Sequence, residues 1–98
     1  MNVIAELSIF PMDKGVSLSA YVARAVRIIE HSGLAHQFGP MSTVIEGDWD
    51  QVMGVVGRCQ ADLARDCDRI LVCLRLDCRR NRENALQGKM RSVQARLD

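Results

Sequence analysis

One stretch of this sequence, residues 39–47, constrains the fold more than any other. It opens with a Gly-Pro turn signal, continues into a β-branched run at residues 43–45, and closes on a second glycine. Glycine and proline bound strands and β-branched side chains favour them, so the stretch predicts a turn followed by a short strand. The same strand carries the polar side chains of Thr43 and Glu46, which are candidates for the chemistry of the chain.

A second strand is predicted near the N-terminus, at residues 3–10. Its apolar residues Val3, Leu7 and Ile9 alternate with a mixed set that includes charged and hydroxyl side chains. Alternation with a period of two is typical of a strand that presents two different faces. Pro11 ends the pattern, because proline has no backbone N–H to donate to a sheet. The mixed face consists of Ile4, Glu6, Ser8 and Phe10.

Two helices are indicated by apolar residues at helical spacing. The first is expected over residues 17–32, with Ser17 as its N-cap and Gly33 as the residue that stops it. The second begins after Asp48, which forms a capping-box pattern with Gln51. Each segment therefore has one apolar face that can pack against a core.

Two further strands and a third helix complete the predicted elements. Residues 35–38 form a weaker strand that the turn at residue 39 closes, and residues 70–77 alternate as a fourth strand. After a basic link, the C-terminal segment has apolar residues spaced four, three and four apart, which predicts an amphipathic helix. These apolar residues are Leu86, Met90, Val93 and Leu97.

The resulting order, β-α-β-β-α-β-α, predicts one α+β domain over residues 1–98. Short connections and right-handed crossovers favour a ferredoxin-like split βαβ sandwich with a C-terminal helix and a four-stranded antiparallel sheet of order 4-1-3-2. The first two helices would cover one face of this sheet. The mixed face would stay uncovered, so we expect the chain to form a homo-oligomer.

The composition is that of an ordinary globular protein. Of 98 residues, 48% are hydrophobic and 26% are charged, and the net charge is +1. A balance so close to neutral gives no electrostatic reason to expect nucleic acid or a membrane surface as a partner. No segment approaches the run of about 18 apolar residues that a membrane span needs, and Glu6 interrupts the N-terminal apolar stretch. We therefore expect a soluble cytoplasmic protein.

The four cysteines have neither CxxC spacing nor a histidine in register with them, so we expect reduced thiols and no metal site. Catalytic patterns are also missing from the sequence. No Ser-His-Asp, Cys-His or paired-carboxylate arrangement and no glycine-rich phosphate loop can be recognised. We therefore expect no catalytic residue, no cofactor and no enzymatic activity. The cysteines are Cys59, Cys67, Cys73 and Cys78.

The candidate binding groups are the hydroxyls of Ser8 and Thr43 and the carboxylate of Glu46, with Phe10 as an aromatic neighbour. Hydroxyl oxygens accept hydrogen bonds from ring amines and a carboxylate balances a positive charge, so this set suits a neutral or cationic heteroaromatic ligand. A second interpretation of Glu46 stays open, because a carboxylate before a helix can simply complement the positive helix end. In a regular strand, moreover, Thr43 and Glu46 point to opposite faces.

Several runs of the chain resemble the thiamine-binding protein family. The resemblance covers nearly the whole chain, and residues 43–47 are its most specific part. The chain departs from the family pattern at residues 12–14 and at Ser42, where many relatives have a small loop and a glycine. The matching runs are Pro11 with Ser17-Leu18-Ser19-Ala20-Tyr21-Val22, then Gly39-Pro40-Met41-Ser42-Thr43-Val44-Ile45-Glu46-Gly47, residues 48–56, Leu74-Arg75-Leu76-Asp77 and Arg79-Arg80.

The resemblance implies a ferredoxin-like fold, dimers formed sheet to sheet that pair into tetramers, and non-catalytic binding of thiamine or its hydroxymethylpyrimidine portion. It implies Ser8, Thr43 and Glu46 as binding residues, with Met41 and Phe10 as apolar walls. The alternative function is a structural or regulatory oligomeric interaction module that has no small-molecule ligand.

Overall fold

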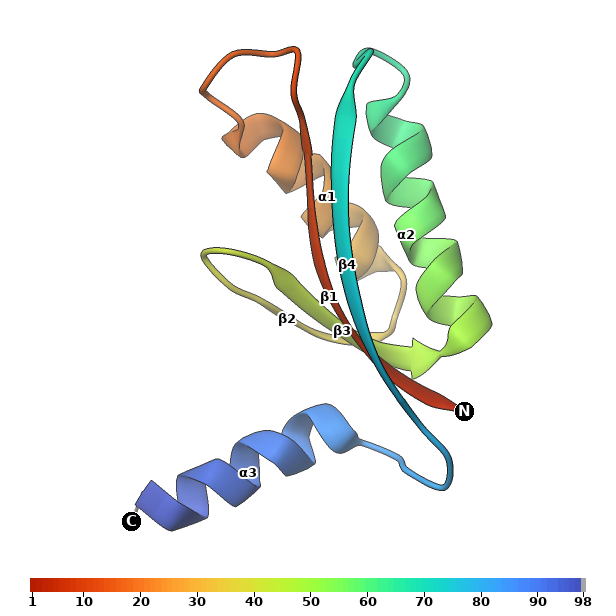
Figure 1. Cartoon of the computed structure of the whole chain (residues 1–98), viewed down its shortest axis with the longest axis vertical. Coiled ribbons are helices and arrows are strands. Elements are labelled where there is room, and N and C mark those ends of the chain that lie inside the picture. Colours follow the sequence, from red (N-terminus) through yellow and green to blue (C-terminus); the bar gives the residue numbers. More distant parts are fainter. Residues whose placement is uncertain (98) are drawn as a thin grey trace.

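The computed structural model describes residues 1–97, and within them the elements follow the predicted order (Figure 1). The strands and helices are β1 (Asn2–Pro11), α1 (Ser19–His31), β2 (Ala35–Phe38), β3 (Thr43–Asp48), α2 (Trp49–Leu63), β4 (Ile70–Arg79) and α3 (Ala85–Leu97). Each predicted strand and helix is present, with bounds that differ from the prediction by about two residues at most ends.

The strands form one antiparallel sheet in the order β2-β3-β1-β4, so the predicted order 4-1-3-2 is confirmed. β1 and β3 are the central neighbours, and their register places Leu7 opposite Thr43 and Ile4 opposite Glu46. Directly opposed residues in an antiparallel pair point to the same face. Thr43 therefore shares the face of Leu7, and Glu46 shares the face of Ile4.

The core lies between one face of the sheet and the helices α1 and α2, which lie side by side against that face (Figure 1). Along β1 the residues alternate strictly between buried and partly buried, so the predicted two-faced strand is confirmed. Burial of these apolar side chains is the main stabilising contribution to the fold. The largest contributors include Val3, Ile29, Ile45, Val52, Val55 and Leu63.

The helix ends follow the sequence signals except at one position. The capping box is confirmed, because the Gln51 N–H donates to Asp48 Oδ1 over 2.8 Å and the Asp48 N–H donates to Gln51 Oε1 over 3.1 Å. Gly33 stops α1 with a φ of 79°. The prediction of Ser17 as N-cap is wrong, because Leu18 holds that position without a side-chain cap. Leu18 is partly buried and lines an apolar cavity, while Ser17 is exposed.

Helix α3 extends away from the layer that α1 and α2 form (Figure 1). Its predicted apolar stripe stays largely open on the single chain, with Met90 52%, Val93 60% and Leu97 74% exposed. Buried within this helix is Ala85, at its first turn. Nowhere in residues 1–97 does a helix combine the length and the apolar character that crossing a membrane requires. All four cysteines are free, with Cys59 and Cys67 buried.

Candidate functional site

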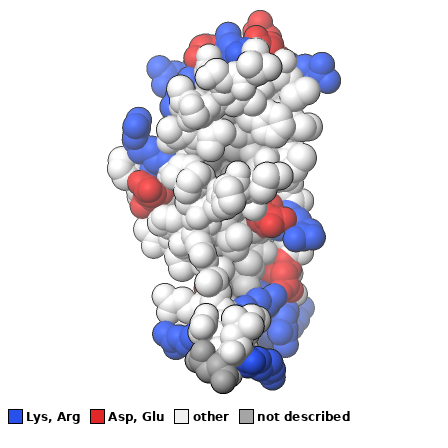
Figure 2. Space-filling view, turned by 90° about the vertical axis from the view of Figure 1, so that its left-hand side faces the viewer, with Lys and Arg blue, Asp and Glu red and all other residues white. Residues whose placement is uncertain are grey.

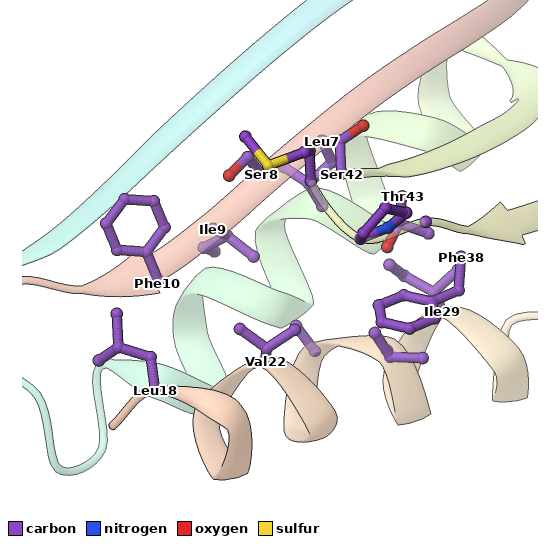
Figure 3. Close-up of a pocket in the computed structure, with 15 residues that line it drawn as sticks. Leu7, Ser8, Ile9, Phe10, Leu18, Val22, Ile29, Phe38, Ser42 and Thr43 are labelled. Atoms are coloured by element: carbon purple, nitrogen blue, oxygen red, sulfur yellow. The ribbon is translucent and has the colours of Figure 1, made fainter. Parts of the chain in front are cut away.

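A cavity of about 300 Å³ lies between the second half of β1, the inner side of α1, and the loop that joins β2 to β3 (Figure 3). Four of the five predicted site residues line it, and the structure thus brings them together from separate elements. The fifth, Glu46, does not line the cavity and lies on the other face of the sheet. The four lining residues are Ser8, Phe10, Met41 and Thr43.

The cavity exists because β1 is longer than its partner β3. β1 pairs with β4 along its whole length, but its pairing with β3 stops at Leu7. Beyond that point the chain leaves the sheet in a turn that the Gly39 N–H closes by donating to the Ser42 carbonyl oxygen over 2.9 Å. A Cβ at Gly39 would come within 3.1 Å of that oxygen, so glycine permits the close approach. Residues 8–11 are left with a bare edge.

The backbone of Ile9 faces this bare edge. The Met12 N–H donates to the Arg69 carbonyl oxygen over 2.7 Å, which identifies the residues of β1 that exchange hydrogen bonds with β4. Residues that bond to one neighbouring strand alternate with residues that bond to the other. Odd-numbered residues of β1 therefore face β3, and Ile9 is the first of them beyond the paired segment. Its N–H and C=O border the cavity as one donor and one acceptor.

Thr43 supplies a buried hydroxyl to the same space. The residue is 5% exposed and, by register, stands on the helix-covered face opposite Leu7. Within residues 1–97 its hydroxyl has no hydrogen-bond partner, and no fully buried side-chain oxygen or nitrogen there lacks one. Because Thr43 also lines the cavity, its hydroxyl is a candidate polar group of that space. Ser8 and Ser42 add two further hydroxyls at the rim.

The walls are apolar and come from three directions (Figure 3). Phe10 and Leu18 close one end, Val22 and Ile29 of α1 lie along the floor, and Phe38 lies beside Thr43 at the other end. Two large apolar side chains stay exposed at the mouth, Phe38 at 58% and Met41 at 86%. Figure 2 looks onto the side toward which the β2–β3 loop projects, and charged side chains gather at its margins while its middle is free of them.

Glu46 lies on the opposite face of the sheet and holds helix α3 in place. Its carboxylate accepts hydrogen bonds from the N–H groups of Ala85 over 2.6 Å and Leu86 over 3.3 Å, and from Asn2 Nδ2 over 2.8 Å. The side-chain carbonyl of Asn2 in turn accepts from Arg82 Nε over 2.7 Å. The interpretation of Glu46 as the complement of a helix end is thus the one that its contacts support, although the helix is α3 and not α2.

The surroundings of Glu46 shift its titration. Burial alone would raise its pKa, but the hydrogen bonds from Asn2, Ala85 and Leu86 and the nearby Arg82 charge favour the carboxylate. The net effect lowers the pKa of Glu46 below its ordinary value of 4.5. The carboxylate form is therefore favoured, and both of its oxygens accept hydrogen bonds within the fold.

Sequence reasoning missed part of the lining. Val22, Ile29 and Phe38 read simply as core or strand residues, and their contribution depends on how α1 and β2 are placed around the loop. The backbone of Ile9 carries no side-chain signal at all. The one available signal was the difference in length between the two central strands, since the first alternating run is longer than the second.

The chain is similar in sequence to a known family and to proteins of other organisms. A family model described as thiamine-binding protein matches residues 5–94. A UPF0045 protein of Methanocaldococcus jannaschii is 33% identical over 92 residues, which is 94% of this chain and 92% of that protein. A UPF0045 protein of Synechocystis is 36% identical over 99 residues, with 100% of this chain and 82% of that protein covered.

Solved structures show the same fold. The structure of the hypothetical protein MJ1052 from Methanocaldococcus jannaschii superposes with a TM-score of 0.86 and 32% identity, covering 95% of this chain and 96% of that one. A Thermotoga maritima protein, whose name proposes a role in thiamine biosynthesis or salvage, gives a TM-score of 0.80 at 20% identity, covering 94% and 99%. The second likeness concerns the fold alone.

We expect Glu46→Gln to lower the free energy of unfolding by roughly 1.5–3 kcal/mol near neutral pH, because it removes a charged acceptor from a helix N-terminus. The folded-state pKa of Glu46 lies below its ordinary value of 4.5, so the stabilisation is fully present above that value. It is lost as the pH falls through the lower folded-state pKa. Urea unfolding of both proteins over a pH series measures the difference.

Glu30→Gln is the matched control, because this carboxylate is exposed on α1 and its loss should change the unfolding free energy little. A Glu46→Gln protein as stable as the wild type near neutral pH would contradict the anchoring role. So would a loss of stability that stays constant down to the lowest pH.

Proposed function

The chain belongs to the thiamine-binding protein family, and on this premise we propose that it binds thiamine, or the hydroxymethylpyrimidine portion of thiamine, without catalysis in the cavity beside β1. The observation that carries the proposal is the pairing of a free backbone donor and acceptor at Ile9 with the buried Thr43 hydroxyl, inside apolar walls. Small-molecule sites typically combine apolar walls with a few placed polar groups of this kind.

The polar groups of the cavity match an aminopyrimidine. Such a ring is flat and presents an amine donor beside a ring-nitrogen acceptor along one edge. The N–H and C=O of Ile9 form the complementary pair, as the edge of a strand does for a neighbouring strand. Thr43 offers a further hydroxyl, and Phe10 and Phe38 supply apolar surface for the ring faces. Glu46 has no part in this arrangement, because its oxygens already accept hydrogen bonds from the first turn of α3.

The size of the cavity favours one ring over two. At about 300 Å³ it lies at the lower limit of cavities that hold drug-sized ligands, which run from roughly 300 to 1,000 Å³. The pyrimidine portion can occupy it, and a second ring must extend past the rim.

We further propose that copies of the chain pair through the sheet face that α1 and α2 leave uncovered, with pairs of dimers as the assembled form. This outer face, defined by Ile4, Glu6, Val44, Leu71 and Arg75, combines apolar and charged groups. Leu71 is 41% exposed, and an ion pair joins Glu6 to Arg75 over 3.1 Å. An uncovered face with apolar side chains among charges favours an interface.

We expect calorimetric titration to show that the wild type binds thiamine. The Thr43→Val variant should bind thiamine about five-fold more weakly, because one neutral hydrogen bond is worth roughly 1 kcal/mol. Ser92→Ala, which removes an exposed hydroxyl on α3, is the control and should bind as the wild type does. Thermal unfolding without ligand establishes that each variant is folded.

Absence of heat with both thiamine and hydroxymethylpyrimidine at millimolar concentration would overturn the ligand proposal and favour the interaction module. Equal affinity of Thr43→Val and wild type would leave the ligand but remove the cavity as its site.

For the assembly, sedimentation at micromolar concentration should give a mass at least twice the 10.9 kDa of the single chain. Leu71→Lys, on the outer face, should shift it toward the monomer, because an unpaired charge would be buried in the interface. Val72→Lys is the matched control, since Val72 is 37% exposed on the neighbouring position of the same strand but points to the other face. A wild-type species of 10.9 kDa would refute self-association.

A further inference from the structure

We propose that Glu6 is the carboxylate that receives the positively charged ring of the ligand, an inference that rests on the proposed function. The cavity beside β1 shares three lining residues with a shallow hollow on the outer face of the sheet. Glu6 and Arg75 also line this hollow but do not line the cavity. The shared residues are Ser8, Met41 and Ser42.

The shared residues form a low rim between the two spaces. Ser8 and Ser42 are small and, by continuation of the β1–β3 register, lie across from each other where the pairing of the two strands ends. Met41 is 86% exposed and its unbranched side chain adapts to what lies beside it. A ligand whose first ring fills the cavity can therefore place its second ring over the rim and reach the hollow on the outer face.

Glu6 stands where that second ring would arrive. Its Oε2 accepts a hydrogen bond of 3.2 Å from the Ser42 hydroxyl, so the carboxylate is tied to the rim itself. The side chain of Glu6 is 43% exposed on the single chain. Glu46 differs, because it is buried and its carboxylate already accepts three hydrogen bonds, two of them from the first turn of α3. A thiazolium cannot lose its charge by releasing a proton, so a nearby carboxylate is the group that stabilises it.

Arg75 competes for the same carboxylate in the free protein. Its Nη2 lies 3.1 Å from Glu6 Oε1, and on the single chain its side chain is 82% exposed. Exposed ion pairs contribute little to stability, because solvent and side-chain entropy offset the attraction. A bound cation can therefore displace Arg75 at small cost, and removing Arg75 should strengthen the binding of a cationic ligand.

Calorimetric titration with two probes tests this role. Thiamine carries the fixed charge, and hydroxymethylpyrimidine is the uncharged portion that would occupy the cavity alone. We expect Glu6→Gln to weaken thiamine binding about ten-fold, because a charge-assisted contact becomes a neutral one. Arg75→Gln should strengthen thiamine binding about three-fold, since a competing charge near the surface is removed. Neither variant should change the affinity for hydroxymethylpyrimidine by more than about two-fold.

Glu83→Gln is the control, because it removes an exposed carboxylate beyond the end of β4, away from both spaces. It should bind both probes as the wild type does. Sedimentation of each variant is measured as well, since Glu6 and Arg75 lie on the face proposed for self-association. A titration in rising salt adds a second readout, in which wild-type affinity for thiamine should fall more steeply than that of Glu6→Gln.

The outcomes separate the two proposals. If the wild type binds thiamine but Glu6→Gln binds it equally well, or with the same salt dependence, the role of Glu6 is overturned and the cavity site stands. An equal loss of both probes in Glu6→Gln would also overturn it, because the effect would then be structural. If the wild type binds neither probe, the proposed function itself fails.

Discussion

The unequal pairing of the two central strands determines most of what is distinctive in this molecule. β1 satisfies its backbone against β4 over its full length, but against β3 only as far as Leu7. A sheet that ended evenly would leave no free donor and acceptor beside α1. Because it ends unevenly, the β2–β3 turn is not paired with β1. Apolar side chains from β1, α1 and this turn therefore surround a cavity. The site is thus a consequence of register and not of any single side chain.

A second constraint acts on the other face, where a buried charge fixes the C-terminal helix. Burying a carboxylate is costly unless donors surround it, and the N-terminus of α3 supplies two of them. Arg82 then joins through Asn2, so the connection between β4 and α3 is tied to the first strand. The two polar groups of β3 therefore serve opposite faces. Thr43 opens toward the cavity and Glu46 toward α3, as strand alternation requires.

The sequence predicted the fold well because the fold depends on local patterns. Alternation along residues 3–10, the capping box at Asp48 and the glycine after α1 each encode their element directly, and the connections then leave one sheet order. The Ser17 cap failed because the N-cap position falls one residue later, on Leu18, a partly buried side chain that lines the cavity. The site was harder to predict. Ser8, Phe10, Met41 and Thr43 could be chosen from composition and resemblance, but the role of Glu46 depends on where α3 lies.

The most direct test of this account is a nitrogen–proton NMR titration of the labelled protein with thiamine, because it reports on individual backbone amides. The account predicts that the Ile9 amide shows the largest downfield shift, as its N–H gains an acceptor, with Thr43 also perturbed. The Ala85 and Leu86 amides, which donate to Glu46, should stay in place. An unmoved Ile9 amide, or perturbations gathered at Ala85 and Leu86, would contradict the account.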